Sequence, residues 1–363
     1  MLTLGVEEEY LLLDPATGTP VARAAQVRRA ADLQPAMDQG EVQRELLQAQ
    51  LEIATPVCHE LEEVGGHLLR MRHALGRAAA QDGCLLAACA SAPFTDHLPV
   101  PVTETVRYRA MHSDAPRLTD EQLICGMHVH LGIPDRATGI ALLNGLRPWL
   151  PLLVALAANS PLSQGTDTGF ASWRTLLFDR WPVSGPPPSF EGADDYDHRT
   201  GALVEDRLIP DLGQIYWHIR LSERFPTVEI RALDVQLRPD EAVMLAGTVR
   251  ALATRLLGDA AAGRPVPVIR PETLDAAVWY GARHGCSGEV FDPLHGGLRA
   301  PGDAVAALQE FTASAAGKDG RHITPVLERI LREGNGAARQ LRELRRGGRE
   351  GLVGMIADQT TGA

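Results

Sequence analysis

Four segments of the chain alternate between aliphatic and polar residues, and this period of two constrains the fold more than any other feature. They are residues 2–13, 46–55, 124–133 and 227–235. Because successive side chains of a strand point to opposite faces, each segment predicts a strand with one aliphatic and one polar face. Such strands are typical of an antiparallel sheet that is covered by helices on one side and lines a cleft with the other. For 46–55 a helical alternative stays open, since it would gather Glu45, Gln48 and Glu52 on one stripe.

The polar faces of these segments carry mainly glutamate, histidine and arginine, with almost no serine or threonine. The residues are Glu7, Glu9, Glu52, His128, His130, Glu229 and Arg231. Carboxylates that converge on one surface repel each other unless cations lie between them. Oxygen-rich sites of this kind select hard ions such as Mg²⁺ or Mn²⁺, and Mn²⁺ also accepts an imidazole. The pattern therefore predicts a divalent metal site on the polar face of the sheet.

Arginine provides nearly all of the positive charge, because Lys318 is the only lysine. A Walker-type phosphate loop needs a lysine followed by serine or threonine, but Asp319 follows Lys318, and no G-x-G-x-x-G fingerprint opens a helix. The usual phosphate-loop and dinucleotide folds are therefore disfavoured. Arg231, and Arg174 in a long loop, could instead bind a phosphate or a carboxylate through two parallel hydrogen bonds.

Charge and composition exclude several classes of protein. The chain has 35 basic and 46 acidic residues and a net charge of −11, so no basic excess is present to bind nucleic acid. No apolar run approaches the roughly 18 residues of a membrane span, and the N-terminus lacks a signal-peptide pattern. The five cysteines form no C-x-x-C pair, which indicates free thiols in a reducing compartment. We therefore expect a cytoplasmic protein without nucleic-acid or membrane partners.

The rest of the chain is mainly helical in its periodicity. Helices are predicted over residues 59–81, 137–158, 240–257, 272–283 and 323–345, and a short buried strand over 84–90. Pro148 and Pro151 should kink or break the second helix. The Gly- and Pro-rich stretch 163–193 predicts a functional loop, because long stretches of weakly structured chain are uncommon in a compact domain.

The spacing of His128 and His130 allows a different site. The same H-x-H pattern holds metal in amidohydrolase barrels, and that alternative predicts zinc binding and no need for a nucleotide. In those barrels the motif ends the first strand, whereas here it comes after more than a third of the chain. The late position counts against a metal-dependent amidohydrolase.

Six blocks of sequence resemble the carboxylate–amine ligases of glutamate–cysteine ligase family 2. They are GVEEEY (5–10), QLEIATPVC (50–58), CGMHVHLG (125–132), TGFASWR (168–174), RWPVSGP (180–186) and PTVEIRALD (226–234). The blocks run in the order of the family, and beyond about residue 235 the likeness rests on helical pattern alone. The resemblance implies one catalytic domain over 1–363, with a motif-bearing core over about 1–240 and a helical part over about 240–363.

The resemblance also implies an α+β fold like that of glutamine synthetase. In this fold a curved antiparallel sheet forms an active-site funnel, with helices packed on its outer face. The implied metal ligands are Glu7, Glu9, Glu52, His128 and Glu229, which would hold Mg²⁺ or Mn²⁺ against the phosphates of ATP. His128, His130 and Arg231 are then expected at the nucleotide. Arg231, Arg174 and Glu52 are expected at the reacting groups, where the arginines meet the transferring phosphoryl group or the substrate carboxylate.

The chemistry of the family is ATP-dependent activation of a carboxylate, typically the γ-carboxylate of glutamate, to an acyl phosphate. An amine, typically that of cysteine, then displaces phosphate to form an amide. The expected partners are thus small-molecule substrates, and the family is compatible with a homodimer. An inactive ligase fold kept as a binding protein is a further alternative, and the intact carboxylates and His128 argue against it.

Overall fold

The computed structural model describes residues 2–31, 33, 42–95 and 99–362. At its centre lies a seven-stranded sheet in which every pairing is antiparallel. The strand order is β10–β11–β5–β1–β3–β2, and β4 pairs with the end of β1. The strands are β1 (Leu4–Leu13), β2 (Val42–Arg44), β3 (Gln50–Ala54), β4 (Leu85–Ala87), β5 (Gly126–Gly132), β10 (Ile219–Leu221) and β11 (Thr227–Asp234).

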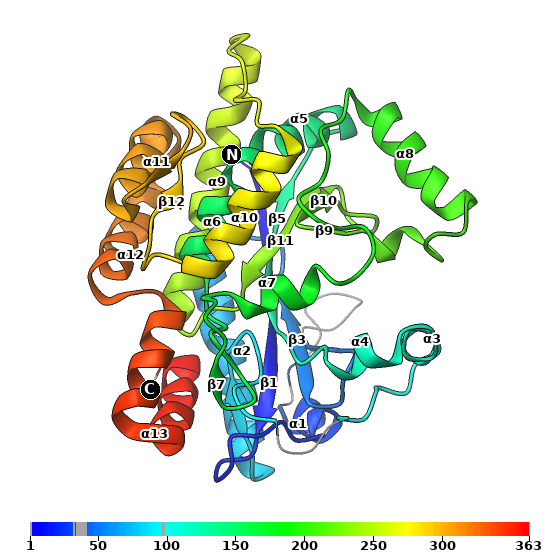
Figure 1. Cartoon of the computed structure of the whole chain (residues 1–363), viewed down its shortest axis with the longest axis vertical. Coiled ribbons are helices and arrows are strands. Elements are labelled where there is room, and N and C mark those ends of the chain that lie inside the picture. Colours follow the sequence, from blue (N-terminus) through cyan, green and yellow to red (C-terminus); the bar gives the residue numbers. More distant parts are fainter. Residues whose placement is uncertain (1, 32, 34–41, 96–98, 363) are drawn as a thin grey trace.

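The aliphatic face of the sheet packs against a layer of helices, as the alternation of its strands requires. Val6, Val129 and Ile230 are each at most 1% exposed on this face. The covering helices are α2 (Leu61–Gln81), α5 (Arg136–Leu146), α6 (Leu150–Ala157) and α9 (Pro239–Ala261). An outer group follows in the sequence: α10 (Pro271–His284), α11 (Pro301–Ala316), α12 (Gly320–Glu333) and α13 (Gly336–Thr361). In Figure 1, α11 to α13 lie on the left of the sheet, and α3 (Val106–Asp114), α4 (Pro116–Asp120) and α8 (Ala193–Glu205) lie on its right.

Shorter elements connect these layers. The helices are α1 (Ala24–Ala30), α3 (Val106–Asp114), α4 (Pro116–Asp120), α7 (Trp173–Phe178) and α8 (Ala193–Glu205). The two-residue strands are β6 (Leu162–Ser163), β7 (Thr166–Asp167), β8 (Ser184–Gly185), β9 (Tyr216–Trp217), β12 (Val290–Phe291) and β13 (Leu298–Arg299). Short 3₁₀ turns cover Arg147–Trp149, Leu212–Gln214 and Gly317–Asp319. The predicted loop 163–193 therefore contains α7 and pieces of strand.

Three of the four predicted sheet strands are confirmed over nearly their full length, and the fourth is shorter than predicted. β3 begins at Gln50, and the helical alternative for 46–55 is wrong. The backbone before β3 pairs with another segment instead: the Gln48 amide donates to the Pro101 carbonyl (2.8 Å). Gln50 Nε2 donates to the carbonyl of Ile124 (2.8 Å) and so braces this corner against the start of β5.

Two helix predictions need comment. The break at Pro148 and Pro151 is confirmed, because a 3₁₀ turn separates α5 from α6. The single terminal helix over 323–345 is wrong, since two helices, α12 and α13, meet at Gly334 and Asn335. Gly334 has a φ of +83°, which ends α12, and the Asn335 side chain accepts a hydrogen bond from the Ala338 amide and caps α13.

One stretch of the described chain, Arg136–Ala157, has the length and composition of a membrane-spanning helix, contrary to the expectation from the sequence. In the fold 89% of its most apolar window is buried inside the protein, where α5 and α6 pack on α9 and β11. The buried core runs without interruption from Leu4 on β1 to Ile356 on α13. The division of the chain near residue 240 stays a prediction.

A buried ion pair crosses the aliphatic layer. Glu8 faces the helices together with Tyr10, and it is fully buried. Arg72 of α2 is its counter-charge, with Nη2 2.5 Å from Oε1 and Nε 2.9 Å from Oε2, and the Tyr10 hydroxyl also donates to Glu8. The remaining guanidinium donors bind the carbonyls of Gln236, Leu237 and Thr360. The pair thus joins the sheet to α2 and to the C-terminal helix.

Candidate active site

The register of the sheet brings the predicted polar residues together. β11, β5, β1 and β3 are neighbours, so their polar faces form one continuous surface. Three couples lie directly opposite each other: Glu7 with His128, Glu9 with Glu52, and Glu229 with His130. The aliphatic sides of the same strands hold them in the core, which fixes the positions of the polar side chains.

A first group of possible metal ligands is formed by Glu7, His128 and Glu229, whose ligand atoms lie within 4.8 Å of one another. His128 Nδ1 is 2.9 Å from Glu7 Oε2. Burial raises the pKa of Glu7, but the hydrogen bond with His128 and the close approach of His130 outweigh it and hold the pKa below its ordinary value. Burial and the nearby Arg231 lower the pKa of His128, which favours the neutral imidazole that binds metals.

A second group consists of Glu9, Glu45 and Glu52, again with ligand atoms within 4.8 Å. Burial, followed by the charges of Glu7, Glu45 and Glu9, raises the pKa of Glu52 well above its ordinary value. Burial and the charge of Glu45 likewise raise the pKa of Glu9. These carboxylates are ionised together only if a cation offsets their repulsion, so the donor set fits a hard divalent ion.

Glu45 is a member of the site that the sequence patterns did not identify. It follows β2, and the pairing of β2 with β3 carries it to Glu52. No strand alternation includes Glu45. Only the helical alternative for 46–55, which is wrong, placed it beside Glu52, so the sequence held no correct local signal for it.

His130 lies beside the first group. Its Nδ1 is 2.9 Å from the Thr227 hydroxyl, and its Nε2 is 3.5 Å from Glu7 Oε1 without a hydrogen bond to any described residue. Burial lowers the pKa of His130, but the nearby carboxylates of Glu7 and Glu229 outweigh it and raise the pKa above its ordinary value. The expected contact of His130 with a nucleotide stays a prediction.

Two arginines hold Glu229 from either side. Arg231 forms an ion pair with Glu229 Oε1, and Arg220 Nε lies 3.1 Å from Oε2. Burial raises the pKa of Glu229, but these guanidinium charges dominate and keep it well below its ordinary value. Arg220, on β10, was not identified from the sequence, because three residues are too few to show an alternation.

Arg174 lies on α7, outside the sheet, and still reaches the same cavity. Its side chain is 2% exposed, and Nη2 donates to the carbonyl of Arg231 (3.1 Å). Nε and Nη1 have no hydrogen-bond partner within the part of the chain that the structure describes. A buried guanidinium with unused donors is suited to bind an anionic ligand.

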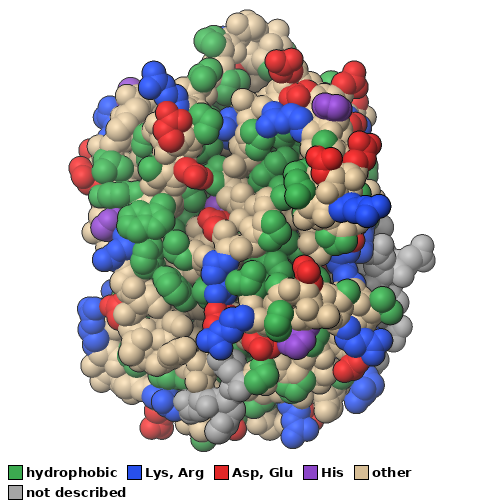
Figure 2. Space-filling model, turned by 45° about the vertical axis from the view of Figure 1, so that its right-hand side comes forward, with side chains coloured by type: hydrophobic (Ala, Val, Ile, Leu, Met, Phe, Trp, Pro, Cys, Tyr) green, Lys and Arg blue, Asp and Glu red, His purple; other side chains and the backbone are tan. Residues whose placement is uncertain are grey.

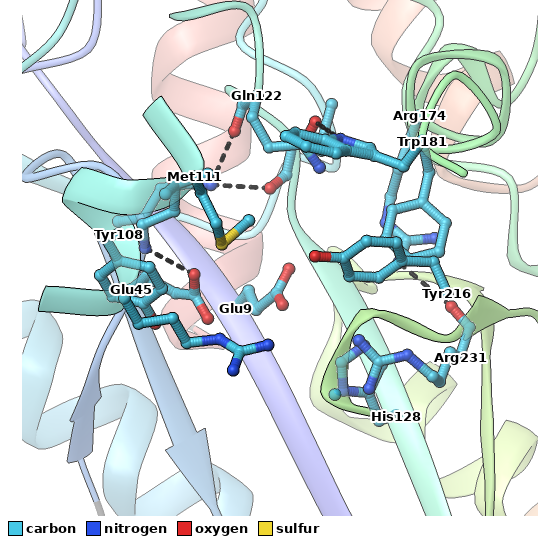
Figure 3. Close-up of a pocket in the computed structure, with 16 residues that line it drawn as sticks. Glu9, Glu45, Tyr108, Met111, Gln122, His128, Arg174, Trp181, Tyr216 and Arg231 are labelled. Atoms are coloured by element: carbon cyan, nitrogen blue, oxygen red, sulfur yellow. Dashed lines mark hydrogen bonds between the residues drawn. The ribbon is translucent and has the colours of Figure 1, made fainter. Parts of the chain in front are cut away.

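Five of these residues line a cavity of about 200 Å³ between the polar face of the sheet, α3, α7 and the segment 213–216: Glu9, Glu45, His128, Arg174 and Arg231. The others, Glu7, Glu52, His130, Arg220 and Glu229, are not among its lining residues. In Figure 3 the carboxylates of Glu9 and Glu45 lie on one side of the cavity, and Arg231 and Tyr216 lie on the other. His128 lies beside the side chain of Arg231, below Tyr216 in this view. On the surface drawn in Figure 2, acidic and basic side chains are likewise found next to each other in the lower middle of the molecule. The cavity can therefore hold a ligand that carries both negative groups and bound cations.

The family model of glutamate–cysteine ligase family 2 matches residues 3–359. The chain belongs to this family. A relative from Mycolicibacterium vanbaalenii, named "Putative glutamate--cysteine ligase 2-2", is 43% identical over 95% of this chain and 93% of the relative. Another, from Saccharopolyspora erythraea and named "Putative glutamate--cysteine ligase 2-1", is 42% identical over 94% of this chain and 90% of the relative.

Solved structures share the fold of this family 2 chain. A glutamate–cysteine ligase from Francisella tularensis, in complex with AMP, has a TM-score of 0.72 at 11% identity and covers 99% of this chain and 88% of its own. A bifunctional glutathione synthetase from Pasteurella multocida has a TM-score of 0.67 at 13% identity, over 99% of this chain and 52% of its own. The predicted glutamine-synthetase-like α+β fold is thereby confirmed.

Family membership makes the chain a ligase, and the amidohydrolase alternative is wrong. The fold agrees, since the H-x-H pair sits in the middle of an antiparallel sheet and not at the end of a barrel strand. Of the two histidines, only His128 belongs to a group of possible metal ligands among the described residues.

Proposed function

We propose that this protein joins the γ-carboxylate of glutamate to an amine, either cysteine or another amino compound, at the expense of ATP. The γ-carboxylate attacks the terminal phosphorus of ATP, which releases ADP and forms an acyl phosphate. The amine then attacks the acyl carbon, and phosphate leaves. The five cysteines are free thiols, which supports action in a reducing compartment such as the cytoplasm.

The observation that carries this proposal is the pairing of two acidic groups with arginines around one cavity. Glu7, His128 and Glu229 form one group, and Glu9, Glu45 and Glu52 form the other. Phosphoryl transfer needs positioning and charge neutralisation more than covalent help from the protein. Mg²⁺ or Mn²⁺ held by these groups would neutralise the phosphate oxygens of ATP and withdraw charge from the transferring phosphoryl group.

The side chains of the protein have separate tasks in this scheme. Arg231 would exchange its contact with Glu229 for the transferring phosphoryl group, whose planar oxygens suit a guanidinium. Arg174 would use its free donors on the phosphoryl group or on the substrate carboxylate. The aromatic side chains of Tyr108, Trp181 and Tyr216 line the cavity and would limit the access of water.

Magnesium-dependent release of ADP from ATP and glutamate tests the proposal. The assay is run without an amine, with cysteine, with a panel of other amines, and with hydroxylamine as a trap for the acyl phosphate. Formation of the hydroxamate of glutamate is the expected result, and the amine with the highest kcat/KM then identifies the acceptor.

Other outcomes separate the alternatives. ATP binding with metal but no turnover with glutamate would contradict the choice of glutamate and direct the search to other carboxylates. Neither turnover nor nucleotide binding would contradict the ligase activity and would favour a binding protein that retains the ligase fold.

A further inference from the structure

Asp234 is a buried carboxylate that the proposed chemistry does not use. It ends β11, is 1% exposed, and lies behind the cavity instead of lining it. Oδ2 accepts hydrogen bonds from the backbone amide of Asn159 (2.8 Å) and the Ser160 hydroxyl (2.7 Å), and Oδ1 accepts one from the Ser172 hydroxyl (2.9 Å). Such a fully bonded buried carboxylate calls for an explanation, because burying a charge is expensive unless it is paired.

The two serines connect Asp234 to the first turn of α7. The Ser160 hydroxyl accepts a hydrogen bond from the backbone amide of Arg174 (3.0 Å). The Ser172 hydroxyl accepts one from the Thr175 amide (3.3 Å) and so caps the helix. Both serines therefore hold the backbone around Arg174 while they donate to one carboxylate.

Asp234 also faces the guanidinium itself. Its Oδ1 is 3.9 Å from Arg174 Nη1, so the two charges attract each other in a site where both are nearly fully buried. Arg174 Nη2 donates to the carbonyl of Arg231, three residues earlier on the same strand. Strand β11 thus carries Arg231, which lines the cavity, and two groups that contact Arg174, namely the Arg231 carbonyl and the Asp234 carboxylate.

Gly126 is also part of the site in which the Arg174 guanidinium packs. It is the register partner of Asp234, at the start of β5. A Cβ atom at this position would lie 2.3 Å from Arg174 Nη2 and 2.8 Å from Cζ, closer than any real contact. The guanidinium therefore rests on the bare backbone of Gly126, and any larger residue must displace it.

A bulge in β11 makes this arrangement possible. The pairing with β5 shifts register between Ile230 and Leu233. Strict alternation would put Asp234 on the aliphatic face with Ile230, but the extra residue reverses the alternation and turns Asp234 to the face of Gly126 and His128.

We propose that Asp234 is a positioning residue for Arg174, and that Gly126 provides the space in which the guanidinium is held at the wall of the cavity. The ligand of Arg174 is an anionic group, the phosphoryl group in transfer or the carboxylate of the substrate. This inference rests on the proposed function, which assigns Arg174 to that ligand.

The primary test is Asp234→Asn, assayed by ADP release from ATP and glutamate. We expect kcat/KM to fall by about 100-fold, since a misplacement on the ångström scale has effects of that order. Asp319→Asn is the matched control, because Asp319 is also buried and pairs with an arginine, Arg250, at 2.6 Å, but neither residue lines the cavity. The control should lose stability and keep its kcat/KM.

A double-mutant cycle distinguishes positioning from a general structural role. If Asp234 acts through Arg174, then Asp234→Asn should reduce kcat/KM only slightly in the background of Arg174→Ala. Added guanidinium ion should also restore part of the activity of Arg174→Ala when Asp234 is present, and less when it is asparagine. Independent losses that multiply, or equal rescue in both backgrounds, would overturn the positioning role.

Gly126→Ala tests the packing site of the Arg174 guanidinium without removing any hydrogen-bonding group. It should lower kcat/KM to a similar extent as Asp234→Asn, and it serves if that variant does not fold. A crystal structure of either variant gives a readout that needs no turnover, and the guanidinium should be displaced from residue 126. An unmoved guanidinium would overturn the proposal, whereas lack of turnover by the wild-type protein would contradict only the proposed function.

Discussion

Three consecutive glutamates on β1 point to opposite faces of the sheet and have different surroundings there. Glu8 points to the helices and is fully buried, and Arg72 and Tyr10 satisfy both of its oxygens. Glu7 and Glu9 point to the opposite face of the sheet, where each belongs to a group of possible metal ligands, and Glu9 lines the cavity. The three residues have the same chemistry and nearly the same place in the chain, and only the face of the strand separates them.

The difference shows how a buried carboxylate reveals its role. The Glu8–Arg72 pair is complete within the protein, so it contributes to the fold. The cluster of Glu9, Glu45 and Glu52 is incomplete, because burial and then the neighbouring negative charges raise the pKa of Glu9 and Glu52. A site that is electrostatically unsatisfied within the protein is suited to a ligand that completes it.

The largest effect on activity is expected from a substitution in the cluster of Glu9, Glu45 and Glu52. Glu52→Gln keeps the size of the side chain and removes its charge. We expect the rate of ADP release to fall by about 10³-fold or more, the scale associated with the loss of a transition-state-stabilising group. The melting temperature without metal should be maintained or raised, because the substitution relieves repulsion. Glu310→Gln, at an exposed position on α11, is the control, and full activity of Glu52→Gln would refute the site assignment.

A substitution in the Glu8–Arg72 pair should lower the stability of the protein instead of its activity. Arg72→Ala leaves Glu8 buried without its counter-charge, and we expect the free energy of unfolding to fall by about 3–5 kcal/mol. Urea unfolding measures this loss, and kcat of the protein that remains folded should be unchanged. A loss below about 1 kcal/mol, the range of a surface pair, would mean that the pair is not essential to the fold.

A smaller effect on activity is expected when the geometry of a cavity arginine changes and its charge is kept. Arg231→Lys keeps the charge at the cavity but replaces the planar donor fork by a point charge. We expect kcat/KM to fall by about 100-fold, since orientation is lost while attraction remains. Arg332→Lys at an exposed position is the control, and near-normal rates for Arg231→Lys would make Arg231 a structural residue.

The last expected effect, similar in free energy to that of Arg231→Lys, is the response to metal. Mg²⁺ at about 100 times its dissociation constant should stabilise the wild-type protein by about 2.7 kcal/mol, as linkage requires for one site. The rise in melting temperature should be reversed by a chelator and be much smaller in Glu52→Gln. Equal stabilisation of both proteins would show that the ion binds elsewhere.

Much of the fold could be predicted, because its central strands have clear alternation. The segments of β1, β5 and β11 were long enough for a period of two to stand out, and their polar faces contained Glu9, His128 and Arg231, which line the cavity. Helix ends were predicted less well. The division of the terminal helix depends on Gly334 and on the cap by Asn335, which are single residues within an otherwise helical pattern.

The sequence by itself determined which face of each strand is buried and which residue types gather on the other, because alternation is a local property of the backbone. It also carried the motifs by which the family is identified. Only the tertiary structure decided that Glu45 joins Glu52 across a hairpin, that Arg174 reaches the cavity from α7, and that a bulge turns Asp234 toward Gly126. These three placements depend on strand register and on contacts between distant segments, which no local pattern encodes.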